Sequence, residues 1–271
     1  MNHLHCISGL PRSGSTLLAS LLSQNPEVHA SMSGPVVSLL ENLLVGMSGQ
    51  SEYSVFLDDS RRERVLRAIV HAYYEDRQKP YIIDTNRAWC AHLPLLWRLF
   101  PEAKIVACVR QMPWILDSIE RLVQKNSLQP SSMFNFQAGG TVYSRTENLA
   151  GASGFVGFSY NALKEAYFHP ENAGRILFLR YESLTTRPRD ALETVAQFLD
   201  LPAFDYDLEN IVLDAHGFDE KVGMPGLHAI SGPIRPWQDR SSLLPPDLFQ
   251  RYVHDAFWEN EDMNVRAVEI F

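Results

Sequence analysis

The sequence has few cysteines, no long apolar run and no excess of positive charge. Its three cysteines among 271 residues cannot all pair with one another, and no histidine and cysteine cluster has the spacing of a metal site. Cys6 and Cys108 fall in predicted core strands, which favours buried apolar side chains. No apolar run reaches membrane-spanning length, and Met1 is followed directly by a predicted strand, without a signal peptide. We therefore expect neither a disulfide-stabilised secreted domain nor stable membrane insertion.

The balance of charge excludes a further class of protein. A formal net charge of −8 argues against broad nucleic-acid binding, which would need a basic face. An acidic chain that binds an anion must instead concentrate its cations at one place. With 45% apolar residues the chain can bury one sizeable core. We expect a single domain over residues 1–271, with no nucleic-acid partner.

A glycine-bounded loop near the N-terminus carries the strongest signal. It follows an apolar strand predicted over His3–Ser8 and leads into a helical pattern over Ser15–Ser23. A strand, loop and helix in this order point backbone N–H groups and the positive end of a helix dipole at one place. The loop therefore predicts a binding site for a phosphate-like anion.

The anion is not expected to be a nucleoside triphosphate. Gly9, Gly14 and Thr16 match the loop G-x-x-x-x-G-K-[ST], but Ser15 stands at the lysine position. ATPases and GTPases need that lysine on the β- and γ-phosphates. The long cation here is Arg12, inside the loop.

A second motif places an arginine at the expected ligand-binding edge of the sheet. The run K-I-V-A-C-V-R ends in Arg110 and is typical of a buried parallel strand. Ligands bind at the carboxyl edge of such sheets. Pro113 suits the first turn of the following helix, and Ser118 lies on that helix, eight residues after Arg110.

Alternation of strands and helices continues through the chain. A third apolar strand, R-I-L-F-L-R from Arg175, is followed by Tyr181 and Glu182, and Arg187-Pro188 opens a helix. Further elements are predicted by the same patterns: a strand over Tyr81–Asp84 and helices over Val36–Met47, Ser60–Asp76, His92–Phe100, Phe155–Phe168 and Pro246–Phe257, with a loop over Pro26–Pro35. The order predicts an α/β protein with a parallel sheet covered on both faces.

The motif P-R-S-G-S-T-L-L from Pro11 to Leu18 is similar to the phosphate loop of the sulfotransferase family. Its arginine resembles the tyrosylprotein-sulfotransferase-like branch and its bacterial relatives more than the cytosolic branch, where lysine is usual. The resemblance implies a P-loop-type parallel β-sheet flanked by helices, the sulfotransferase fold. It also implies a cytoplasmic bacterial enzyme that transfers a sulfuryl group from 3′-phosphoadenosine-5′-phosphosulfate (PAPS) to a hydroxyl or amine acceptor and releases PAP, without a metal.

The resemblance further assigns ligand-binding roles. Loop groups would hold the 5′-phosphate: Arg12, Ser13, Gly14, Ser15 and Thr16. Arg110 and Ser118 would hold the 3′-phosphate, while Tyr181 either contacts the adenine or packs in the core. A C-terminal segment over residues 222–245 would fold over the nucleotide, with Ser231 and Arg235 reaching its phosphates.

Three residues are candidates for catalysis. Arg12 is expected to stabilise charge on the leaving group. The family's second cation, a lysine in the tyrosylprotein branch, aligns with Thr85; the nearest cation, Arg87, either reaches the same space or pairs with Asp84. His228 is the preferred general base, because a histidine pKa lies near working pH.

The general base and the acceptor stay open at this point. The family's glutamate position falls near Met32, where no carboxylate stands. The alternatives to His228 are His29, Asp84 and Glu41. The apolar segment Met32–Leu44 suits a small-molecule, lipid or peptide acceptor alike.

Other interpretations also remain. The polar stretch 127–154 is either a lid or acceptor-binding insert or a plain surface excursion. The alternative functions are a P-loop nucleotide kinase or NTPase and a non-catalytic nucleotide-binding protein. A homodimer is compatible with the sequence, which does not set the order of association.

Overall fold

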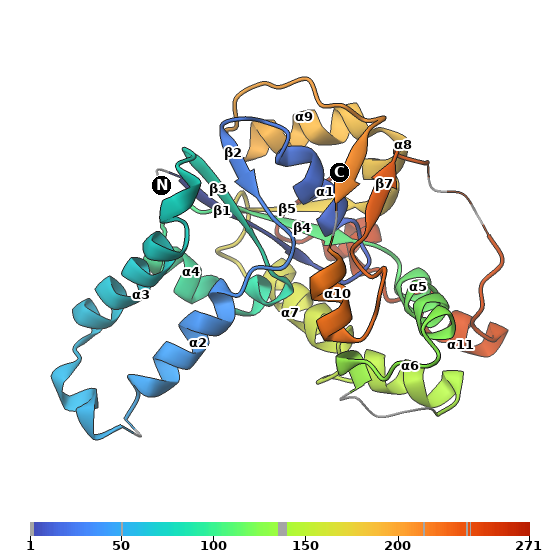
Figure 1. The fold of residues 1–271 in the computed structure, drawn as a ribbon, viewed down its shortest axis with the longest axis horizontal. Helices are drawn as coiled ribbons and strands as arrows, with labels where there is room; N and C mark the ends of the chain where they lie inside the picture. The colour runs from blue at the N-terminus through green and yellow to red at the C-terminus, as the bar shows by residue number, and fades with distance from the viewer. Residues whose placement is uncertain (1–2, 50, 135–139, 214, 237, 239) are drawn as a thin grey trace.

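A parallel sheet lies at the centre of the molecule. The computed structural model describes residues 3–49, 51–134, 140–213, 215–236, 238 and 240–271. Within these ranges the central sheet has six strands in the spatial order β2-β3-β1-β4-β5-β8, and all neighbouring strands run parallel (Figure 1). Its strands are β1 (His3–Gly9), β2 (Val28–Ala30), β3 (Tyr81–Thr85), β4 (Ile105–Val109), β5 (Ile176–Arg180) and β8 (Glu269–Ile270). The expected α/β class is confirmed.

Helices cover both faces of this sheet. One face packs against α1 (Ser15–Leu22), α8 (Tyr181–Thr186) and α9 (Pro188–Phe198). The other packs against α3 (Asp59–Tyr73), α4 (Leu93–Leu99), α5 (Met112–Lys125) and α7 (Gly157–Phe168). The remaining α-helices are α2 (Val36–Gly46), α6 (Val142–Ala150), α10 (His216–Val222) and α11 (Pro246–Arg251). No described helix is long and apolar enough to cross a membrane.

The composition of β4 explains its central place. Ile105, Ala107 and Val109 point into the core beneath α5 and α7, whereas Val106 and Cys108 point into the core beneath α1. All five side chains are fully buried. A strand covered on both faces needs a continuous apolar run rather than an alternating one, as β4 has.

Short elements depart from the sequence-based expectations. β2 lies inside the predicted loop Pro26–Pro35, and the C-terminal β8 was not expected. Strands of three and two residues have no measurable periodicity, so only their pairing with β3 and β5 defines them. The helix predicted over Pro246–Phe257 ends at Arg251.

Two parts of the chain for which no helix or strand was predicted contain regular structure. Within 127–154, α6 begins at a reciprocal capping pair between Thr141 and Ser144, while residues 135–139 lie outside the described part of the chain. Nearer the C-terminus, β6 (Ile211–Leu213) and β7 (Ile230–Gly232) form an antiparallel pair, and α10 lies between them in the sequence. The insert and the covering segment stay predictions as functional units.

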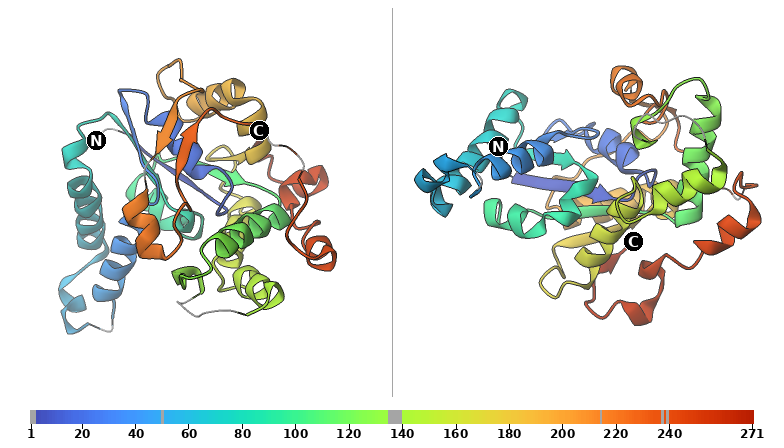
Figure 2. Two further views of the ribbon diagram at one scale, coloured as in Figure 1. Left: turned by 45° about the vertical axis from the view of Figure 1, so that its right-hand side comes forward. Right: turned by 90° about the horizontal axis from the view of Figure 1, so that it is seen from below.

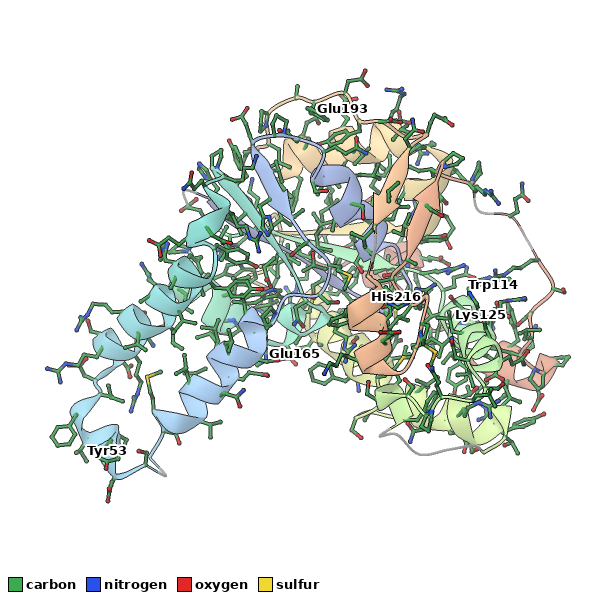
Figure 3. All side chains as sticks on the ribbon, viewed as in Figure 1. Tyr53, Trp114, Lys125, Glu165, Glu193 and His216 are labelled. Carbon is green, nitrogen blue, oxygen red and sulfur yellow. The ribbon has the colours of Figure 1, made fainter. Side chains whose placement is uncertain are left out.

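A helical projection extends from one side of the sheet. It consists of α2, the 3-10 helix η1 (Glu52–Phe56) and α3, and it reaches away from the body in all three views (Figures 1 and 2). Tyr53 lies near its far end (Figure 3). Val36, Val37 and Leu40, at the near end of α2, are buried in the core. The near end of α2 is therefore held rigidly beside the sheet.

The closest backbone approach in the sheet yields a stability prediction. Gly9 has a φ of +104°, and a Cβ at this position would lie 2.2 Å from the Cys108 carbonyl oxygen. Gly9→Ala therefore has to separate β1 from β4. We expect a loss of about 1–3 kcal/mol from overpacking, and about 1–2 kcal/mol more from the left-handed backbone, in urea unfolding.

Gly46→Ala is the matched control for this measurement. No atom lies within 4 Å of a Cβ at Gly46, the last residue of α2. Because alanine is the better helix former, this variant should be neutral or more stable by up to about 1 kcal/mol. Equal stability of the two variants would contradict the close approach at Gly9.

Candidate functional site

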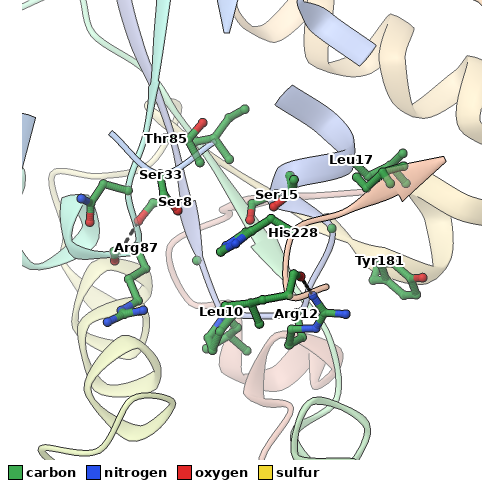
Figure 4. Close-up of a pocket in the computed structure, with 18 of the residues that line it drawn as sticks. Ser8, Leu10, Arg12, Ser15, Leu17, Ser33, Thr85, Arg87, Tyr181 and His228 are labelled. Atoms are coloured by element: carbon green, nitrogen blue, oxygen red, sulfur yellow. Dashed lines mark hydrogen bonds between the residues drawn. The ribbon is translucent and has the colours of Figure 1, made fainter. Parts of the chain in front are cut away.

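The carboxyl ends of the central strands open into one large cavity. Its volume is about 1170 Å³, and its walls come from the loop after β1, the end of β3, the near ends of α2 and α7, and the segment 227–235 (Figure 4). This is the edge at which open parallel sheets bind ligands. Segments far apart in the sequence thus meet at one place.

The loop after β1 forms a cradle at the floor of the cavity. Gly9, Arg12 and Gly14 have left-handed φ values of +104°, +59° and +94°. Gly14 is the N-cap of α1 and offers no side-chain bond to its first turn. The first N–H groups of α1, beside Ser15 and Thr16 in the cavity wall, are therefore the groups that an anion can accept hydrogen bonds from.

The side chain of Ser13 does not belong to this wall. Its hydroxyl is buried and donates to the carbonyl oxygens of Leu10 and Cys108, the latter at 2.9 Å. The hydroxyl thus braces the loop from behind. Of the predicted contacts of Ser13, only those from the backbone can reach a ligand.

The second predicted anion site lies next to the first. Arg110, 5% exposed at the end of β4, donates from Nη1 to the Arg12 carbonyl oxygen at 3.2 Å. The Arg12 Nε donates to the Ser118 Oγ at 3.1 Å, and its Nη1 donates to the Leu227 carbonyl oxygen. The guanidinium of Arg110 lies 4.3 Å above the Tyr181 ring. The fold therefore brings together Arg12 of the first motif with Arg110 and Ser118 of the second.

The electrostatics of this corner favour an anion. Burial lowers the pKa of Arg12 to about 10, and the positive charge of Arg110 contributes to this shift. Burial also lowers the pKa of Arg110, and the nearby charge of Arg240 acts in the same direction on both arginines. A bound polyanion would compensate these clustered positive charges.

Arg240 was missed by the sequence analysis. It donates to Asp117 Oδ2 at 2.8 Å, and the same oxygen accepts from Arg121 Nε at 2.9 Å. Asp117 is fully buried and also accepts from the Leu243 backbone N–H at 2.7 Å. Burial opposes ionisation, but these bonds and charges together lower the pKa of Asp117. The only sequence signal was an acidic residue in the apolar stripe beside Ser118.

The covering segment supplies further wall residues. Ser231, on β7, and Arg235, just after it, line the cavity together with Leu227, His228 and Ile234. The segment lies against the loop after β1, because the Leu227 carbonyl oxygen accepts from Arg12 Nη1. Its contacts with a nucleotide stay a prediction.

Arg87 lies in the cavity wall, and its alternative role as a partner of Asp84 is not observed. The Arg87 guanidinium lies 3.8 Å above the Phe155 ring, and burial there lowers its pKa. Asp84 is fully buried and instead accepts from the Tyr74 hydroxyl and, at 2.6 Å, from Trp89 Nε1. Burial raises the pKa of Asp84. Asp84 is therefore part of the core, which removes it as a candidate base.

Thr85 stands where the family resemblance places a lysine. It lies at the end of β3 in the cavity wall and is 5% exposed. Its hydroxyl has no hydrogen-bond partner among the described residues. A small polar group therefore replaces the long cation, and Arg87 is the nearest cation in the sequence.

The other base candidates differ in their access to the cavity. His29 packs against the Tyr74 ring, with centroids 5.6 Å apart, and is not in the cavity wall. Glu41 reaches the wall from α2, but its Oε1 lies 2.8 Å from His92 Nε2. His228 lies in the cavity wall beside the loop, one residue after Leu227, whose carbonyl oxygen accepts from Arg12 (Figure 4).

His228 has a buried carboxylate behind it, which the sequence analysis missed. Asp219, on α10, has Oδ1 2.7 Å from the His228 Nδ1, and its Oδ2 accepts from the His228 backbone N–H at 2.9 Å. Burial lowers the pKa of His228, Asp219 acts to raise it, and Arg12 and Arg87 lower it further; the net direction is down. The ring is therefore neutral near pH 7.

The polar side chains of the cavity indicate which kind of ligand it suits. No group of three or more histidine, cysteine, aspartate or glutamate residues within the described ranges could hold a metal ion. The polar groups of the cavity are guanidiniums, hydroxyls, amides, one imidazole and one carboxylate. Such groups suit a phosphate-bearing ligand.

Two curated proteins are similar in sequence to this chain. An uncharacterised protein of Aquifex aeolicus is 24% identical over 226 residues, which is 75% of this chain and 26% of that protein. A putative protein-tyrosine sulfotransferase of Caenorhabditis briggsae is 24% identical over 204 residues, which is 72% of this chain and 64% of that protein. The chain thus spans only part of the length of these curated relatives.

A solved structure and a family model complete the comparison. The sulfotransferase domain from the curacin biosynthetic pathway has the same fold, with a TM-score of 0.57 at 17% identity over 93% of this chain and 96% of that domain. The model described as "Sulfotransferase family" matches residues 6–206. This range includes the loop after β1, Arg110 and Ser118. On this match, which covers well over half of its length, the chain belongs to the sulfotransferase family.

Proposed function

We propose that this protein transfers a sulfuryl group from PAPS to a hydroxyl or amine acceptor and releases PAP. The observation that carries the proposal is the meeting of Arg12, Arg110 and Ser118 in one buried corner, where Arg110 donates to the Arg12 carbonyl oxygen and Arg12 donates to the Ser118 hydroxyl. A nucleotide with two separated phosphates needs two anion sites, and this corner adjoins the loop cradle. The geometry suits such a ligand better than a triphosphate.

The residues of the cavity fit the parts of that nucleotide. The N–H groups of the loop with Ser15 and Thr16 would hold the 5′-phosphosulfate end. Arg110 and Ser118 would hold the 3′-phosphate. Tyr181 would lie beside the adenine, while Ser231 and Arg235 would cover the nucleotide from the C-terminal segment.

The transfer itself would use three side chains. Arg12 would stabilise the charge that grows on the bridging oxygen as its bond to sulfur breaks and the electron pair leaves with PAP. Arg87 would act on the acceptor side. His228 would take the proton from the acceptor as the new bond to sulfur forms. Metal-independent, in-line transfer is part of this proposal.

The acceptor class stays broad. The relative from Caenorhabditis briggsae is named a putative protein-tyrosine sulfotransferase, yet no carboxylate stands near Met32. The acceptor side of the cavity carries Phe155, Phe158 and Phe218 besides Glu41. We propose a small-molecule, lipid or peptide acceptor with an apolar portion beside the reacting group.

The proposed function leads to three predictions, and the first concerns nucleotide binding. PAP at about 100 times its Kd should stabilise the fold by about 2.7 kcal/mol, which corresponds to a rise in Tm of about 5 °C. ATP with magnesium should change Tm by less than about 1 °C, because Ser15 replaces the lysine that a triphosphate needs. A larger shift with ATP and magnesium would favour the kinase or NTPase alternative.

A second prediction separates the two phosphate sites. Arg110→Ala should weaken PAP binding by about 10- to 150-fold, the loss of a charged hydrogen bond worth about 1.5–3 kcal/mol, while AMP binding changes little. Titration calorimetry measures both affinities. Arg189→Ala, at an exposed ion pair with Asp205, is the control and should change neither. An equal loss for AMP and PAP would remove Arg110 from the 3′-phosphate site.

A third prediction concerns the chemical step. In a screen of phenols, sugars, peptides and lipids with labelled PAPS, the wild-type protein should yield a sulfated product. With the best acceptor, Arg12→Ala should lower kcat by about 100- to 1,000-fold, as loss of a charge-stabilising donor does. Binding of PAP with neither a sulfated product nor sulfate release from PAPS, in every acceptor class, would support the non-catalytic alternative.

A further inference from the structure

We propose that Asp219 is a positioning residue that holds His228 in the tautomer of a general base, with Nδ1 protonated and Nε2 free to accept a proton. The inference rests on the proposed sulfuryl transfer and adds a second member to its acid–base machinery. It is drawn from the two hydrogen bonds between these residues and from their place in the cavity wall.

Both carboxylate oxygens of Asp219 are directed at the same histidine. Oδ1 lies 2.7 Å from Nδ1, and Oδ2 accepts from the backbone N–H at 2.9 Å. The Asp219 side chain is 1% exposed and that of His228 is 16% exposed. Because a carboxylate can only accept, Nδ1 must carry the hydrogen, which leaves the lone pair on Nε2.

The local fold fixes this pair. α10 ends at Val222, and the left-handed φ of its C-cap Gly223, +71°, turns the chain back. The Met224 N–H donates to the Asp219 carbonyl oxygen at 2.9 Å. The Phe218 ring packs edge-on against the His228 ring, with centroids 5.3 Å apart. The helix, the turn and the aromatic contact leave the imidazole little rotational freedom.

The charges around the ring suit a base. Arg12 from the loop and Arg87 after β3 disfavour a protonated imidazole, as burial does. Asp219 is the group that opposes them. The ring is thus neutral before the reaction, and a carboxylate adjoins it when it becomes an imidazolium.

The proton balance of the step follows. The O–H bond of the acceptor breaks, its proton goes to Nε2 of His228, and its electron pair forms the bond to sulfur. The bond between sulfur and the bridging oxygen breaks, and that electron pair leaves on the phosphate of PAP. Asp219 takes no proton and only keeps Nδ1–H in place.

Asp219→Asn tests the inference sharply, because an amide has only one accepting oxygen. The His228 backbone N–H can only donate, so the amide oxygen must face it and the NH₂ group must face Nδ1. The histidine hydrogen then has to move from Nδ1 to Nε2. A protonated Nε2 cannot take the proton of the acceptor. Nitrogen-15 NMR of labelled histidine should show the unprotonated nitrogen at Nε2 in the wild-type protein and at Nδ1 in the variant.

Kinetics give the second readout. The variant should lose about 100-fold or more in kcat, within the range of general-base catalysis, with PAP affinity unchanged. Removal of the group that raises the pKa of His228 should also move the acid limb of any residual kcat profile to lower pH. Asp205→Asn makes the same change at an exposed carboxylate and should alter neither measurement. The double variant Asp219→Asn with His228→Gln should have a kcat little lower than that of His228→Gln alone, because Asp219 acts through His228.

The results separate this inference from the proposed function. A wild-type histidine protonated on Nε2, or an Asp219→Asn protein with unchanged tautomer and kcat, would overturn the inference while transfer from PAPS still stands. A wild-type protein that binds no PAP would overturn the proposed function instead. If the variant does not fold, the tautomer of the wild-type ring decides alone.

Discussion

The carbonyl oxygen of Cys108 is the point on which the geometry of the cavity depends. It accepts from the Leu10 N–H at 2.9 Å and from the Ser13 hydroxyl at 2.9 Å. The absence of a side chain at Gly9 lets β1 approach this carbonyl closely. The loop after β1 is therefore fastened to β4 before any ligand binds, and the cost of ordering it has already been met in folding.

The same contact relates the two cationic positions to each other. Arg110 follows β4 directly, and its guanidinium reaches the carbonyl oxygen of Arg12. The spacing between the two arginines is thus set by the parallel pairing of β1 with β4 and by the hydrogen bonds that fasten the loop to β4. Such a rigid framework suits a ligand whose two anionic groups lie at a fixed separation.

Much of the structure around the loop after β1 and the end of β4 could be predicted from the sequence, because its signals are local and strong. The continuous apolar run of β4, the two glycines of the loop and the position of Ser118 each act over a few residues. The inward hydroxyl of Ser13 could not be foreseen, since the same residue type serves both inside and outside such loops. The core role of Asp84 depends on Tyr74 and Trp89, which only the fold brings to it.

The acid–base side of the cavity was harder to predict for a different reason. β6, β7 and α10 are short, and β6 and β7 are defined by their pairing with each other rather than by their own periodicity. Asp219 pairs with His228 within the folded-back segment, and Arg240 pairs with Asp117 on α5, which is distant in the sequence. The histidine could be proposed from its chemistry, but its carboxylate partner could not.

The burial of Cys108 has a consequence for the redox chemistry of the protein. Its thiol points away from the cavity into the core beneath α1, and burial raises the pKa of this thiol to about 12 and that of Cys90 to about 11. Alkylating agents and peroxides attack the thiolate, which neither group forms near neutral pH. The backbone that anchors the loop thus belongs to a residue that mild oxidants leave untouched.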